Sequence, residues 1–226
     1  MISDWLAGAL GEGNTKNGLI ESNWFTMASW RFEVSLIVAA VGACLFFLGM
    51  KAMIQIVGVS QKKMDYQDAL MGRLFSIGAV TACVSELFIH VVMVIMPILY
   101  KELYETSLMG ADIIFIEERF FHALAVPYYA FFFLPMILIS VSFGYMILTG
   151  RFRITNLFLL LNPLVMYGLS FVFKMIRVVP VADFGVALVS FGYVLVFLGG
   201  ILQLTYIVRR RAMRKKRERS GRREQE

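Results

Sequence analysis

The chain has 226 residues, of which 59% are hydrophobic and only 17% charged, with a formal net charge of +6. A soluble domain has about a quarter of its residues charged and about half apolar. This composition, arranged in long apolar runs, excludes an ordinary soluble enzyme and indicates an integral membrane protein with one helical bundle.

The N-terminal residues 1–33 are predicted to form an extracytoplasmic segment. This segment begins with MISDWLAGALGEGNTKNG, which lacks both a basic start and a long apolar core, so no secretory signal peptide is expected. Trp24 and Trp30, near its end, are typical of the aromatic belt at a membrane interface.

Residues 34–208 are predicted to form an all-α transmembrane bundle of five helices. Each apolar run is long enough to cross about 30 Å of hydrocarbon at 1.5 Å per residue. Cys44 and Cys83 both lie inside such runs, where cysteine behaves as a small buried hydrophobic residue, so no disulfide framework is expected. The five runs are Val34–Val59, Leu74–Tyr100, Phe120–Thr149, Ile154–Phe173 and Phe184–Val208.

The connections between the runs differ in charge. Lys and Arg gather in residues 60–73 and 150–153, whereas residues 101–119 carry five acids. The positive-inside rule therefore predicts the N-terminus outside and the C-terminus inside. We expect a multi-pass protein of the cell membrane.

The tail, residues 209–226, holds ten Lys or Arg and three Glu, a net +7, so the rest of the chain carries −1. Because the positive charge follows a hydrophobic helix directly, the tail indicates a cytoplasmic anchor and excludes nucleic-acid binding by a basic domain. The partners expected are membrane lipids, with anionic lipid at the tail.

Two helix faces stand out. In the second run, small and polar residues recur at a helical spacing, which predicts that this face packs against other helices. In the fifth run, Gly185, Gly192 and Gly199 recur every seven residues, which indicates a packing seam or, alternatively, a face along which a substrate slides. The residues of the first face are Ser76, Ala79, Cys83, Glu86 and His90.

The chain has two histidines, and each follows a glutamate by four residues. Glu86 and His90 lie in ELFIH, and Glu118 and His122 lie in ERFFH. Residues four apart share a helix face, so both pairs are expected to meet in the outer half of an antiparallel helix pair.

Three interpretations of these four residues remain open. They are candidate metal ligands, since imidazole and carboxylate suit Zn, Mn or Fe. They also fit a polar-ligand or proton-handling site, or a structural network that includes Asn162. Neighbouring Glu117 and Arg119 are typical of a solvated face.

The stretches SDWLAG, SWR and TGRFRITNLFLLLNPLV, followed after about 20 residues by FGVALVSFGYVLVF, resemble an uncharacterised family of bacterial multi-pass membrane proteins. The resemblance covers most of the chain and implies a six-helix bundle whose first helix would precede Met1. It implies no activity and no cofactor. A second stretch, FIHVVMVIMPILYKELYE, is similar to sterol-isomerase-like membrane proteins, but Val94 stands where that family places a glutamate.

The leading functional hypothesis is therefore a non-enzymatic membrane protein that binds or passes a small or amphipathic ligand in a polar pocket of the bundle. The alternatives are an intramembrane enzyme acting on a lipid or sterol, with Glu86 or His90 as the acid–base group, and a structural subunit of a larger complex.

Overall fold

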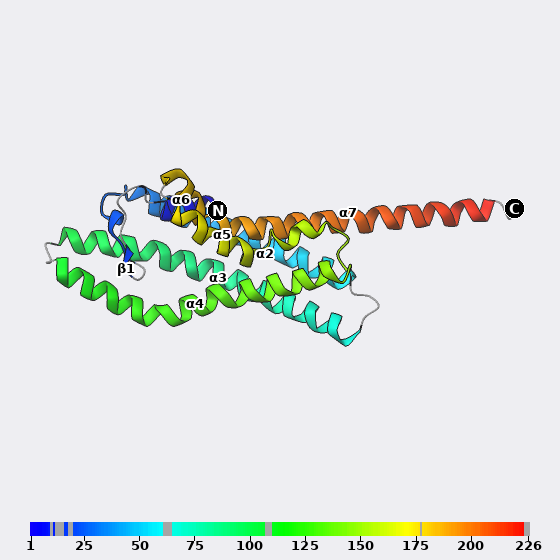
Figure 1. Ribbon diagram of the computed structural model, residues 1–226, viewed down its shortest axis with the longest axis horizontal. Helices are drawn as coiled ribbons and strands as arrows, with labels where there is room; N and C mark the ends of the chain where they lie inside the picture. Colours follow the sequence, from blue (N-terminus) through cyan, green and yellow to red (C-terminus); the bar gives the residue numbers. More distant parts are fainter. Residues whose placement is uncertain are drawn as a thin grey trace.

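The computed structural model describes residues 1–9, 11, 16–17, 20–60, 65–106, 110–176 and 178–223. Within these residues, four helices are long and apolar enough to cross a membrane, and they form an elongated bundle (Figure 1). They are α2 (Trp30–Ser60), α3 (Tyr66–Glu105), α4 (Gly110–Leu148) and α7 (Leu188–Arg223). The prediction of a helical bundle is confirmed, whereas the number of spans and their orientation stay predictions.

The shorter elements lie around one half of this bundle. Helices α1 (Ile2–Gly8), α5 (Pro163–Met175) and α6 (Val179–Val186) gather beside the start of α7 (Figure 1). A small antiparallel hairpin of β1 (Lys16–Asn17) and β2 (Ile20–Glu21) and the 3-10 turn η1 (Ser22–Trp24) connect α1 to α2.

The prediction that Ile154–Phe173 forms one spanning helix is wrong. This run is divided into the 3-10 turn η2 (Asn156–Leu159) and α5, whose 13 residues extend for about 20 Å. The break occurs at Asn162, whose side-chain oxygen accepts hydrogen bonds from the N–H groups of Leu164 and Val165, at 3.0 and 3.1 Å. An Asn cap followed by Pro163 starts a new helix, because proline suits the first helical turn.

Two apolar clusters form the core. The larger one joins α2, α3, α4, η2 and α7 around Phe75, Phe143 and Met53. The smaller one joins α1, η1, α2 and α3 around Phe32 and Val94. Along α3, the polar pair Glu86 and His90 comes between the residues of the two clusters.

The glycine seam predicted in the fifth run is confirmed as a packing surface. A Cβ at Gly192 would lie 2.6 Å from the Cα of Pro163, and one at Gly199 would lie 2.8 Å from the Phe143 ring. Gly185 belongs to α6 rather than to the long helix, and it packs against Ser170 and Phe173 of α5. The absence of side chains at these glycines lets α5, α6 and α7 approach closely.

Candidate functional site

The candidate site is a buried polar cluster that α1 completes from the N-terminal segment. Ser3 and Ser35 hold α1 against α2: each hydroxyl donates to the other residue's backbone carbonyl, at 3.0 and 2.9 Å. Ala7 adds α1 to the smaller apolar cluster. These contacts direct Asp4, one residue after Ser3, towards α3.

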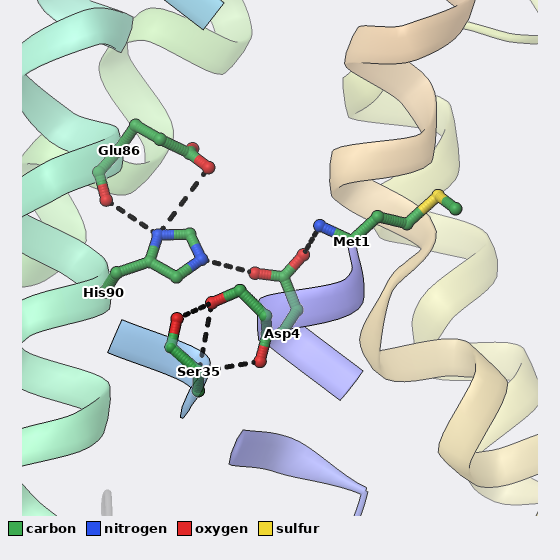
Figure 2. A network of polar contacts seen from close by, with 6 residues as sticks. Met1, Asp4, Ser35, Glu86 and His90 are labelled. Atoms are coloured by element: carbon green, nitrogen blue, oxygen red, sulfur yellow. Dashed lines mark hydrogen bonds and ion pairs between the residues drawn. The ribbon is translucent and has the colours of Figure 1, made fainter. Parts of the chain in front are cut away.

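His90 is the centre of this cluster (Figure 2). Its Nε2 lies 2.7 Å from Oδ1 of Asp4, and its Nδ1 lies 2.7 Å from the backbone carbonyl oxygen of Glu86. The carboxylate of Glu86 lies 3.6 Å from the same Nδ1. His90 is 5% exposed, so its side chain faces other protein segments, whereas Glu86 lies at the edge of the cluster with its side chain 26% exposed.

The two nitrogen contacts restrict the protonation of this group. A backbone carbonyl oxygen only accepts hydrogen bonds, so Nδ1 of His90 must carry a hydrogen. The 2.7 Å contact between Nε2 and Asp4 then holds one further proton, on either the imidazole or the carboxyl group. The cluster therefore stores a proton between a histidine and a carboxylate, with the second carboxylate of Glu86 alongside.

Asp4 is itself buried, and its other oxygen, Oδ2, lies 2.5 Å from the amino group of Met1. Burial acts to raise the pKa of Asp4, but the hydrogen bond with His90 and the positive amino group hold that pKa below its usual value. Asp4 therefore behaves as a carboxylate tied to positive partners.

The structure brings together only two of the four predicted site residues. It brings Glu86 and His90 together, whereas the His122 side chain is exposed and Glu118 is half-buried. No group of three or more His, Cys, Asp or Glu side chains in the described part of the chain is arranged to hold a metal ion. Both nitrogens of His90 already face hydrogen-bond partners. A metal site of Glu86, His90, Glu118 and His122 stays a prediction.

The side chain of Asn162 forms its hydrogen bonds at the start of α5. Besides capping α5, its side-chain amide donates to the carbonyl of Leu159 at 2.7 Å. Its hydrogen-bond partners among the described residues therefore all belong to the η2–α5 corner, and none of them is Glu86 or His90.

Sequence analysis did not identify two candidate residues, Asp4 and Glu117. Asp4 lies 86 residues before His90, in a helix of seven residues, so no periodicity connects them. Glu117 was assigned to a solvated face, which is wrong: it is fully buried, and neither of its carboxylate oxygens has a hydrogen-bond partner among the described residues. Its spacing of four from Ile113, also buried, is the signal that identifies this inward face.

Comparison with known proteins adds a family but no activity. The model of DUF6796, described as a family of unknown function, matches residues 1–206. No curated protein and no solved structure matches the chain.

Proposed function

The chain belongs to DUF6796, a family of unknown function, and we propose that it is a non-enzymatic membrane protein that uses an exchangeable proton at Asp4, His90 and Glu86. The proton serves the binding or passage of a small or amphipathic ligand. Four apolar helices of spanning length support a place in a membrane.

The observation that carries this proposal is the short contact between His90 and Asp4. Their 2.7 Å separation is that of a strong hydrogen bond across which a proton can be shared. Burial of both groups excludes water from that contact, so changes in its charge affect the packing of α1 on α3.

Glu86 gives this shared proton a route outward. Its side chain is 26% exposed, compared with 6% for His90. At 3.6 Å from Nδ1, this carboxylate is beyond a direct hydrogen bond. A proton therefore reaches it from His90 only through one bridging water or a side-chain rotation, and Nδ1 then gives up the hydrogen that it shares with the Glu86 carbonyl.

The test uses the fact that the chain has only two histidines. In His122→Gln, a single imidazole remains, so ¹⁵N-histidine NMR of the full chain in lipid nanodiscs reports on His90 alone. We expect a pH-dependent change between a doubly protonated imidazole and the tautomer with hydrogen on Nδ1. Asp4→Asn is expected to shift that change to a lower pH, because the negative charge beside Nε2 is lost.

An imidazole with one tautomer and no change from about pH 5 to 10, well beyond the usual histidine range, contradicts the proposal. In that case, the cluster only fastens α1. The matched control is Glu118→Gln, the removal of a carboxylate in the other Glu–His pair, which is expected to leave the His90 signal unchanged.

A further inference from the structure

We propose that a second site, at the opposite end of the bundle from the α3–α4 connection, binds a phosphate group such as that of an anionic lipid headgroup. This basic end consists of the last residues of α2, residues 150–153 after α4, and residues 203–211 of α7. It is independent of the His90 cluster, and its cavity has a volume of about 330 Å³.

Gln203 builds the wall of this cavity. It is 3% exposed, and its side-chain oxygen accepts a hydrogen bond from the backbone N–H of Arg153 at 2.7 Å. Its amide group donates to the hydroxyl of Ser60 and to the carbonyl of Arg151, both at 3.1 Å. One buried side chain therefore fixes α2, the 150–153 connection and α7 relative to one another.

Four arginines line the cavity, and one of them is already neutralised. Arg151 forms an ion pair with buried Asp68, which also accepts a hydrogen bond from Tyr145 at 3.2 Å. Arg153, Arg210 and Arg211 are exposed and form no ion pair with a described residue. Three positive charges thus converge on a cavity whose lining includes no acid among the residues that the structure describes.

The residues of α7 that line the cavity lie on one face of this helix. Gln203, Tyr206, Ile207, Arg210 and Arg211 follow the spacing of residues that share a side of a helix. Arg210 and Arg211 therefore lie on the same side as the buried Gln203, rather than being scattered around the basic tail.

The chemistry of the lining favours phosphate. Guanidinium groups bind phosphate oxygens through paired, charge-assisted hydrogen bonds, and three of them match an anion with more than one negative charge. The cavity has a volume of about 330 Å³. This exceeds a single phosphate ion and leaves room for the glycerol or sugar that carries it.

The surroundings fit a lipid as the source of that phosphate. Val59 and Ile207 add apolar surface to the cavity, and Leu204 and Val208 of α7 are exposed beside it. Headgroups of a bilayer lie at the ends of spanning helices, which is where this cavity opens if α2 and α7 cross the membrane. A cavity between the end of α2, residues 150–153 and α7 distinguishes this site from a general attraction of the basic tail to anionic lipid.

The experiment is native mass spectrometry of the full chain in detergent, titrated with phosphatidic acid. The variant Arg153→Gln/Arg210→Gln/Arg211→Gln removes the three charges that form no ion pair with a described residue. The matched control Arg217→Gln/Arg222→Gln/Arg223→Gln removes three charges from farther along the tail. We expect the first to bind at least about tenfold more weakly, since each lost charge-assisted pair matters by this order, and the control within about twofold.

Equal binding by wild type and cavity variant, or an equal loss in the control, overturns the proposal, because the tail charge would then suffice. Thermal unfolding verifies that the variants are folded, and Arg210→Gln alone, one exposed helical side chain, replaces the triple variant if that fails to fold. Competition by glycerol 3-phosphate identifies the source. Displacement at concentrations similar to those of the lipid indicates a soluble phosphate ester, and its failure indicates a lipid headgroup; both support phosphate binding.

Discussion

Glu117 and His90 are both buried, but these two residues differ in the hydrogen-bond partners of their side chains. His90 is enclosed, but both of its nitrogens contact oxygen atoms. Glu117 is equally enclosed, and neither of its oxygens has such a contact in the described part of the chain. Burial of an unpaired polar group costs free energy, so a protein that keeps one gives up stability at that position.

We therefore expect Glu117→Met to stabilise the protein, by about 1–3 kcal/mol, the typical cost of a buried unsatisfied polar group. The measurement is the free energy of unfolding in detergent. Asp112→Asn, which changes an exposed acid on the same helix, is the control and is expected to have little effect. A loss of stability in Glu117→Met contradicts the prediction and indicates that the carboxyl group has a partner in the folded protein.

Residue-level sequence reasoning identifies His90 and Glu86 because i and i+4 positions in a helix are neighbours. It fails for Asp4, because the contact depends on α1 folding back onto α2 through Ser3 and Ser35. Such a contact between segments distant in the sequence leaves no periodic signal. The Glu–His spacing also pairs Glu118 with His122, but exposure of His122 depends on how α4 is rotated, which spacing alone does not determine.

At the level of elements, α1 is held in place by charge as well as by packing. The pKa of Asp4 is held below its usual value by its positive partners. A carboxylate whose pKa is depressed in the folded state adds stability above the unfolded pKa, and this stability is lost as pH falls through the folded pKa. The contribution of Asp4 to the docking of α1 is thus expected to be constant from neutral pH down to about pH 4, and to be lost as the pH falls further towards the lowered pKa of folded Asp4.

Hydrogen exchange of residues 2–9, followed by mass spectrometry, measures this docking. We expect faster exchange in α1 below about pH 4, after correction for the intrinsic pH dependence of exchange, with the middle of α4 as internal reference. Asp4→Asn is expected to give fast exchange in α1 at neutral pH as well. Slow exchange in α1 of Asp4→Asn would show that Ser3, Ser35 and the apolar contacts suffice.

The approach of α7 to α5 depends on a glycine. A Cβ at Gly192 would overlap the backbone of Pro163, at 2.6 Å from Cα and 2.9 Å from N, whereas a Cβ at Gly168 of α5 meets nothing within 4 Å. Backbone cannot rotate away as a side chain can. We expect Gly192→Ala to destabilise the protein by about 1–3 kcal/mol, the usual cost of overpacking.

Gly168→Ala is the matched control. It adds the same methyl group to a helix with open space around it, so the better helix propensity of alanine is expected to leave stability unchanged or raised by less than about 1 kcal/mol. Both are measured as the midpoint of thermal unfolding. Equal midpoints for the two variants contradict the close contact of α5 and α7.

The helix boundary before α5 cannot be detected from hydrophobicity alone. Residues 154–173 are apolar enough for a spanning helix, and hydropathy alone joins them into one. The side chain of Asn162 nevertheless satisfies the first free N–H groups of α5, and Pro163 is compatible with a first helical turn but not with the middle of a helix. The Asn-Pro pair was the local signal for this boundary.

On the scale of the whole molecule, α3 sets the dimensions. Its 40 residues correspond to a length of about 60 Å, twice the roughly 30 Å of membrane hydrocarbon. Figure 1 shows α4 returning antiparallel beside it, while α7 continues past the end of the bundle. The exposed apolar side chains along α2, including Ile37, Val41 and Leu45, are consistent with contact to acyl chains.

The length of α3 allows the orientation to be tested with one helix. If α3 crosses the membrane, its two ends lie in different aqueous compartments. The distribution of Lys and Arg predicts that Thr106, after its last turn, is outside and that Tyr66, at its first turn, is inside. Both side chains are exposed, so cysteines placed there are accessible to reagents.

In a Cys44→Ala/Cys83→Ala background, we expect a membrane-impermeant maleimide to label Thr106→Cys in intact cells and Tyr66→Cys only after permeabilisation. Leu87→Cys, exposed midway along α3, is the control: it is expected to resist the charged reagent in both conditions, because hydrocarbon surrounds it. Labelling of Thr106→Cys and Tyr66→Cys from the same side would show that α3 does not span, whatever its hydropathy. Reversed labelling would keep the span and place the basic end, with its arginine-lined cavity, on the outer face.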